Sequence, residues 1–202
     1  MSTENQSGFQ RLFIAISVPE AVRKEIARMQ ARLKRASPSG SVRWTRSEQF
    51  HITLKFLGDV PINQLETLKD SIASACAGMY PPQIAALGTG FFPNRRNPRI
   101  IWIGAHDDTG STVKLHRRMT GMLHWLLPAE RSEKFTGHIT LGRFKPGHHA
   151  SIPRTVEQAT VFHRQFFGQW QADEIELVRS ELNSTGAEHT AIAIYPLNAP
   201  QP

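Results

Sequence analysis

Cysteine, long apolar runs and acidic residues are all scarce in this chain of 202 residues. The single cysteine, Cys76, forms no disulfide within the chain and cannot supply a multi-cysteine zinc or iron–sulfur site. No apolar run approaches the length of a membrane span, and residues 1–8 lack the pattern of a signal peptide. We therefore expect a cytoplasmic protein that has no membrane segment, with residues 1–8 disordered.

Negative charge is in deficit, with 17 Asp and Glu against 24 Lys and Arg, which leaves a net charge of +7. This balance favours a polyanionic partner, although an ordinary basic surface would give the same figure. Phosphate-binding patterns of the G-x-G-x-x-G and Walker types are absent, which argues against a nucleotide-cofactor fold. The length and a hydrophobic share of 40% suit one domain over residues 1–202.

Hydrophobic periodicity divides the chain into intermixed strands and helices. The patterns predict strands near 11–17, 50–57, 83–92, 99–104, 136–144, 173–182 and 189–196, and helices near 19–36, 61–77 and 112–127. Residues 145–167 carry no clear pattern. Several strands are joined by short turns, which favours an α+β fold with largely antiparallel sheets over a doubly wound parallel sheet. Cys76 falls on the apolar stripe of the second helix and is expected in the core.

One four-residue motif occurs twice. His51–Leu54 and His138–Leu141 both read His-Ile-Thr-Leu, and they begin 138 − 51 = 87 residues apart. Each copy lies in a predicted strand, and a duplicated structural unit explains the repeat. Because strand side chains alternate, His and Thr share one face of each strand while Ile and Leu face the core. If the two units pack about a pseudo-twofold axis, both His-Thr faces line one cleft.

Strict alternation also makes predictions for the residues that follow each motif. Phe56 falls on the core face, so core packing is its leading interpretation and stacking on a base is the second. Arg143 also falls on the face opposite His138, and it reaches the cleft only if the strand twists, bulges or ends there.

Two facing histidines suit in-line displacement at phosphorus. Imidazole titrates near neutral pH, so one ring can act as base while the other acts as acid. The hydroxyls of Thr53 and Thr140 can donate to the non-bridging phosphate oxygens, and Arg143 and Lys55 can add positive charge. This chemistry needs neither a metal nor an organic cofactor.

Rival sites have weaker support in the sequence. A metal site is the strongest rival because imidazole is a common ligand, but Thr is a poor zinc ligand and neither motif contains an acidic residue. No H-E-x-x-H or G-x-S-x-G pattern occurs, which disfavours a zinc protease or a Ser-His-Asp hydrolase.

The two H-x-T-x motifs, with their flanking residues, resemble a known family. The segments that carry the likeness are Arg11–Ala15, Arg43-Trp44, His51–Gly58, Pro98–Trp102, Phe135 and Arg143 around the second motif, and Arg179–Leu182. They are similar to the RNA 2',3'-cyclic phosphodiesterase family, also called the LigT-like or 2'-5' RNA ligase family, of the two-histidine phosphoesterase superfamily. The likeness covers about residues 10–197. The chain departs from the family at Gly137, where Pro is usual, and at Gly142, where Ala is usual.

The resemblance implies two pseudo-symmetric lobes whose antiparallel sheets face a positively charged central cleft, with helices outside. It implies hydrolysis of RNA 2',3'-cyclic phosphate ends to 2'-phosphomonoesters, with 2'-5' ligation as the reverse reaction. Carried over, His51 is the proton donor, His138 is the proton acceptor, and Thr53 and Thr140 hold the phosphate. Neither a metal nor a cofactor is expected.

Further partners of the site stay open at this stage. Arg95, Arg96 and Arg99 are candidates for contacts with the RNA backbone, and an exposed basic loop explains them equally well. Lys55 is another candidate. The expected partner is an RNA or oligonucleotide with a cyclic phosphate end, bound by a monomer. The alternatives are a phosphodiesterase for 2'-5' linked oligonucleotides or small cyclic nucleotides, and an RNA-end-binding module without catalysis.

Overall fold

The computed structural model describes residues 8–127, 135–147, 152–183 and 186–198. The strands are β1 (Phe9–Ser17), β2 (Val42–Trp44), β3 (His51–Pro61), β4 (Gln83–Phe92), β5 (Ile100–His106), β6 (His138–Phe144), β7 (Phe166–Gln171), β8 (Glu174–Asn183) and β9 (Gly186–Pro196). The helices are α1 (Glu20–Ala36), α2 (Leu65–Cys76), α3 (Ser111–Met122) and α4 (Ile152–Thr160). The predicted disorder of residues 1–8 lies, apart from Gly8, outside the described residues.

The predicted strands and helices are present in the structure, with shifted ends. Helix α3 stops at Met122, earlier than its pattern indicated, because Gly121 weakens the last turn. The periodicity missed β2, β7 and α4, which are short: three, six and nine residues. Segments of that length give too few turns or alternations to stand out from a loop.

The strand order has an internal symmetry that relates two repeats of the chain. Hydrogen bonding links them in the order β7-β4-β5-β6-β3-β1-β8-β9, with β2 added beside β6. Every pairing is antiparallel. With β2, β7 and β9 left aside, the chain runs β1-α1-β3-α2-β4 and then β5-α3-β6-α4-β8, so β1 corresponds to β5, β3 to β6 and β4 to β8. The fold is therefore α+β and duplicated, with its pseudo-twofold axis between β3 and β6.

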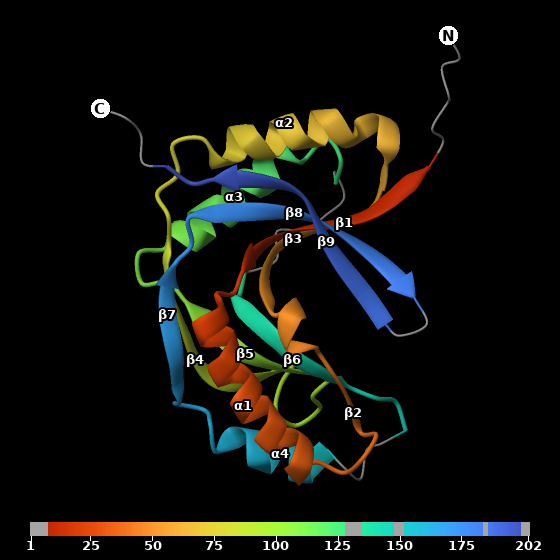
Figure 1. Ribbon diagram of the computed structural model, residues 1–202, viewed down its shortest axis with the longest axis vertical. Helices are drawn as coiled ribbons and strands as arrows, with labels where there is room; N and C mark the ends of the chain where they lie inside the picture. Colours follow the sequence, from red (N-terminus) through yellow and green to blue (C-terminus); the bar gives the residue numbers. More distant parts are fainter. Residues whose placement is uncertain (1–7, 128–134, 148–151, 184–185, 199–202) are drawn as a thin grey trace.

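The two lobes are interleaved and do not coincide with the two halves of the chain (Figure 1). The His51 lobe contains β3, β1, β8 and β9, with α2 and α3 packed on it. The His138 lobe contains β6, β5, β4, β7 and β2, with α1 and α4 packed on it. The first helix and last strand of each repeat thus cross to the other lobe, which ties the lobes together.

The apolar half of each motif anchors its strand in the core. Ile52, Leu54, Ile139 and Leu141 are all buried in a cluster that also includes residues of α1, α2 and α3. Full burial of one such side chain contributes about 1.5–3 kcal/mol. Cys76 is buried in the same cluster, as predicted, and burial raises the pKa of its thiol to about 12. It is therefore a poor nucleophile.

Candidate active site

The two motifs meet at the centre of the sheet. His51 and His138 are the first residues of β3 and β6, and these strands pair through Ile52 and Ile139. The paired residues occupy the same position in each motif, so the pseudo-twofold axis passes between them. With both isoleucines buried, the His and Thr side chains of both strands lie on the opposite face of the sheet.

Each histidine is held by the same hydrogen bond. The Nδ1 of His51 lies 2.7 Å from the carbonyl oxygen of Gln49, and the Nδ1 of His138 lies 2.8 Å from that of Thr136. A carbonyl only accepts, so Nδ1 carries the proton in both rings and Nε2 is left for chemistry. The Nε2 of His51 is 3.1 Å from the Oγ1 of Thr53.

Burial keeps both imidazoles neutral. The pKa of His51 is lowered to about 4, mainly by desolvation; the charges of His189 and His138 add to this lowering, and the hydrogen bond to Gln49 opposes it. Desolvation and then the charge of Arg143 lower the pKa of His138, against the hydrogen bond to Thr136. These effects show that His138 lies within electrostatic reach of both His51 and Arg143.

A β-bulge occurs at the leucine of each motif. Between β1 and β3 the register passes from Ala15–Thr53 to Ile14–Lys55 and skips Leu54. Between β5 and β6 it passes from Trp102–Thr140 to Ile101–Gly142 and skips Leu141. An extra residue in one strand shifts the alternation of all residues after it. Both segments consequently have the same burial sequence over six residues, and the sixth is exposed.

The bulges decide the faces of Phe56 and Arg143. The prediction that Phe56 packs in the core is wrong, because the bulge turns it outward with 63% of its surface exposed. Its ring centroid lies 6.2 Å from that of Phe13, which in turn lies 4.9 Å from His51. Arg143 is exposed as well, and the bulge that its approach to His138 required is present.

Lys55 lies on the other side of the strand. It is buried, and its Nζ is 3.5 Å from the Oγ1 of Thr120 on α3. This placement contradicts its assignment as an RNA contact, because the bulge that exposes Phe56 turns Lys55 inward. The equivalent residue of β6, Gly142, has no room for a side chain, since a Cβ there would lie 2.7 Å from Val42. Strand β2, which supplies Val42, pairs only with β6 among the described strands.

Aromatic rings that sequence reasoning missed surround both histidines. His189 on β9 meets His51 edge-on at 5.4 Å, and both rings contact Phe13. Phe92 at the end of β4 meets His138 edge-on at 4.8 Å, with Trp102 at 6.3 Å. His189 and Phe92 are 138 and 46 residues from the histidines they contact (189 − 51 and 138 − 92), and no repeated pattern marks them.

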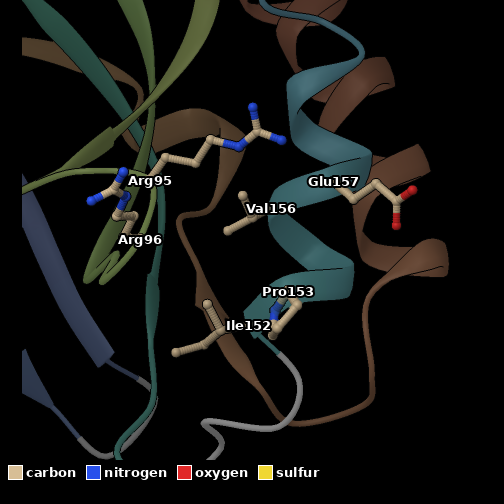
Figure 2. Close-up of a pocket in the computed structure, with 6 residues that line it drawn as sticks. All are labelled: Arg95, Arg96, Ile152, Pro153, Val156 and Glu157. Carbon is tan, nitrogen blue, oxygen red and sulfur yellow. The ribbon is translucent and has the colours of Figure 1, made fainter.

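The basic loop between β4 and β5 lies beside a groove. Arg95 and Arg96 line a cavity of about 500 Å³ together with the helix α4 residues Ile152, Pro153, Val156 and Glu157 (Figure 2). Figure 2 shows the side chain of Arg95 extending toward α4. Arg95, Arg96 and Arg99 are all exposed. The loop begins immediately after Phe92, whose ring contacts His138, so it starts beside His138.

Neither a metal site nor a membrane-spanning helix is found in the described part of the chain. No group of three or more His, Cys, Asp or Glu residues there is arranged to hold a metal ion. Among the same residues, no helix combines the length and the apolar character needed to cross a membrane.

Comparisons with known proteins decide the family. A family profile described as LigT like Phosphoesterase matches residues 16–102. An RNA 2',3'-cyclic phosphodiesterase of Thermus thermophilus is 30% identical over 93% of this chain and 90% of its own length. The chain belongs to the LigT-like phosphoesterase family. Another relative with the same name, from Methanothermobacter thermautotrophicus, is 28% identical over 93% of this chain and 98% of its own length.

Solved structures agree with the LigT-like fold. A crystal structure of a Thermus thermophilus protein matches 95% of this chain and all of its own, with a TM-score of 0.77 and 26% identity. Escherichia coli LigT complexed with 3'-AMP matches 94% of this chain and 98% of its own, with a TM-score of 0.72 and 21% identity. The duplicated antiparallel fold of this chain is thus one that solved structures already show.

Proposed function

We propose that this LigT-like protein hydrolyses RNA 2',3'-cyclic phosphate ends to 2'-phosphomonoesters by two-histidine acid–base catalysis. The observation that carries the proposal is the equivalence of His51 and His138 about the Ile52–Ile139 pair, with Nε2 available for chemistry in both. The relatives named RNA 2',3'-cyclic phosphodiesterase support the substrate class.

The reaction follows from the two available nitrogens. The Nε2 of His138 accepts a proton from water as the water oxygen attacks phosphorus. The Nε2 of His51 gives a proton to the 3'-oxygen as the bond between phosphorus and that oxygen breaks. One P–O bond forms and one breaks, the proton gained by His138 balances the proton lost by His51, and the phosphate stays on the 2'-oxygen.

A bound phosphate raises the pKa of His51, so that its ring carries the proton it has to donate. The pKa of about 4 leaves this proton donor neutral near pH 7 without substrate. An anion beside Nε2 favours the protonated ring and raises that pKa. Thr53, Thr140 and Arg143 then donate hydrogen bonds to the non-bridging oxygens, whose charge grows in the transition state.

The in-line geometry orients the nucleoside. Base and acid act on opposite sides of phosphorus, so the leaving ribose lies toward the His51 lobe. On that lobe the exposed ring of Phe56 is placed to stack on the terminal base. The corresponding residue of the other lobe, Arg143, is a cation suited to phosphate.

RNA preceding the terminal nucleotide is assigned to the basic loop. Arg95, Arg96 and Arg99 are exposed on a loop that starts beside His138. Replacing Arg95 and Arg96 together by Ala should lower kcat/KM for an oligonucleotide and leave it unchanged for a cyclic mononucleotide. The defect should shrink as salt rises, because phosphate contacts are salt-dependent. Equal loss on both substrates would overturn this assignment.

The proposed activity is tested with an oligoribonucleotide ending in 2',3'-cyclic phosphate, with EDTA present. We expect complete conversion to the 2'-phosphate. Conversion abolished by EDTA would overturn the metal-independent mechanism, and binding without conversion would indicate an RNA-end-binding module. The cytoplasmic location and the monomeric state remain predictions.

A further inference from the structure

In a 2',3'-cyclic phosphate, either of two ester oxygens can be the leaving group. The 2'- and 3'-oxygens are both bonded to phosphorus, and either can stand in line with the attacking water. His51 protonates whichever oxygen is turned toward it. A single product therefore requires a further group beside His51 that holds the ribose in one orientation.

His189 lies at that place. Its ring meets that of His51 edge-on, with centroids 5.4 Å apart and planes at 73°. It also contacts Phe13 at 5.0 Å, so three rings form one cluster on the face of the sheet that carries His51. His189 is half-buried, and its remaining surface is open to a ligand.

A third bulge turns His189 onto this face. Between β8 and β9 the register passes from Leu177–Ala193 to Val178–Ala191 and skips Ile192. Val178 lies opposite Phe13 on β1, so Ala191 and His189 share the face of Phe13. In Figure 1, β9 lies beside β8, and it is the last strand of the sheet on the side of the His51 lobe.

Two side chains tie β9 to the segment before His51. The guanidinium of Arg46 and the amide of Gln49 both donate hydrogen bonds to the carbonyl of Ala187, two residues before His189. The carbonyl of Gln49 accepts the Nδ1 proton of His51. One residue, Gln49, thus fixes the positions of both imidazoles relative to each other.

The other polar groups around His51 have other roles. Thr53, whose Oγ1 lies 3.1 Å from the Nε2 of His51, is assigned to the phosphate in the proposed function, and the amide of Gln49 donates to Ala187. Ser17, opposite His51 on β1, has Glu176 as its side-chain partner. Burial, and then the charge of Arg46, lower the pKa of His189, so near pH 7 its ring is neutral and offers one N–H donor.

The other histidine has a different neighbour. His138 is met edge-on at 4.8 Å by Phe92, which offers no hydrogen bond. An apolar edge is sufficient beside the ring that activates water. A donor is needed only on the side where the ribose leaves.

We propose that His189 selects the leaving oxygen by donating a hydrogen bond to the 2'-oxygen, the ester oxygen that stays on phosphorus. This hydrogen bond turns the 3'-oxygen toward His51. The assignment rests on the proposed hydrolysis and adds a specificity-determining residue to it.

The test compares three enzymes on adenosine 2',3'-cyclic phosphate, with the 2'- and 3'-monophosphates separated by chromatography. His189→Phe keeps an aromatic ring against Phe13 and His51 but has no donor. We expect a share of 3'-phosphate at least about tenfold above wild type and a loss of about tenfold in kcat/KM, the size of one hydrogen bond. His189→Asn keeps a donor and should retain the 2'-phosphate as the main product.

A matched control separates selection from packing. Phe92→Leu removes the equivalent edge contact at His138, so it should lower the rate without changing the isomer ratio. Thermal unfolding is recorded for every variant, and His189→Val replaces His189→Phe if the latter does not fold. An unchanged isomer ratio in the donor-free variant would overturn the assignment alone. Comparable amounts of both isomers from wild type would overturn the assignment and the 2'-phosphate product of the proposed function, while the hydrolysis itself would stand. Absence of wild-type turnover would overturn the proposed function and, with it, this assignment.

Discussion

The two halves of the active site have the same backbone arrangement and the same four motif residues, but different side chains around them. Both motifs begin a strand, hold their histidine by a carbonyl two residues earlier and contain a bulge at the leucine. The sixth residue is Phe56 in one copy and Arg143 in the other. The duplicated backbone therefore supplies two equivalent imidazoles, and in the proposed mechanism the side chains that differ around them give the substrate a direction.

Removing either of the two equivalent histidines should give the largest loss of activity. His51→Ala and His138→Ala should each lower kcat by about 10²–10⁴-fold, because general acid and base catalysis each contribute on that scale. The double variant should be little slower than either single one, since acid and base act in the same step. Single-turnover assays on a cyclic phosphate substrate measure both effects. Strictly multiplicative losses would contradict a shared site.

Arg143 should give the next largest effect. Arg143→Ala should lower kcat by about 10²-fold, because its charge acts on the phosphate as charge develops. Arg143→Lys should recover part of the loss, as Lys keeps the charge without the bidentate geometry. Steady-state kinetics provide the comparison, with Lys24→Ala, an exposed residue of α1, as a surface control. A change in KM alone would assign Arg143 to binding only.

Replacing Phe56 should change mainly KM, in contrast to replacing Arg143, which should change mainly kcat. Phe56→Ala should raise KM by about tenfold with a smaller change in kcat, because stacking on a base is worth about 1–3 kcal/mol. Phe56→Tyr should be close to wild type, since it retains an aromatic face. The same assays measure these values, and an equal response to a substrate without a nucleobase would show that no stacking occurs.

The burial of His51 should appear as a dependence of stability on pH. Its pKa is about 4 in the folded protein, below the ordinary value of 6.5, so the unfolded chain binds more protons between these values. The free energy of unfolding should therefore fall as pH drops from 6.5 toward 4, by on the order of 2 kcal/mol from this group. His51→Asn should weaken that dependence. Urea unfolding at several pH values measures it.

Local patterns predicted most of the helices and strands and the faces of the four motif residues. Alternation placed Ile52, Leu54, Ile139 and Leu141 in the core, and the repeat singled out His51, Thr53, His138 and Thr140. These features depend on side chains close together in the sequence, where the period of two governs the faces. The same rule failed at Phe56 and Lys55, because a bulge depends on pairing with another strand and leaves no mark in the sequence.

By itself the sequence determined the duplicated motif and the α+β class, since these follow from residue types and from the periods along single elements, and it predicted the two-histidine chemistry. Only the tertiary structure decided which side chains surround each histidine. His189 and Phe92 reach their partners through strand order and register, which are set by pairing across the whole sheet. That pairing buries Lys55, exposes Phe56 and Arg143, and makes the two related halves of the site chemically unequal.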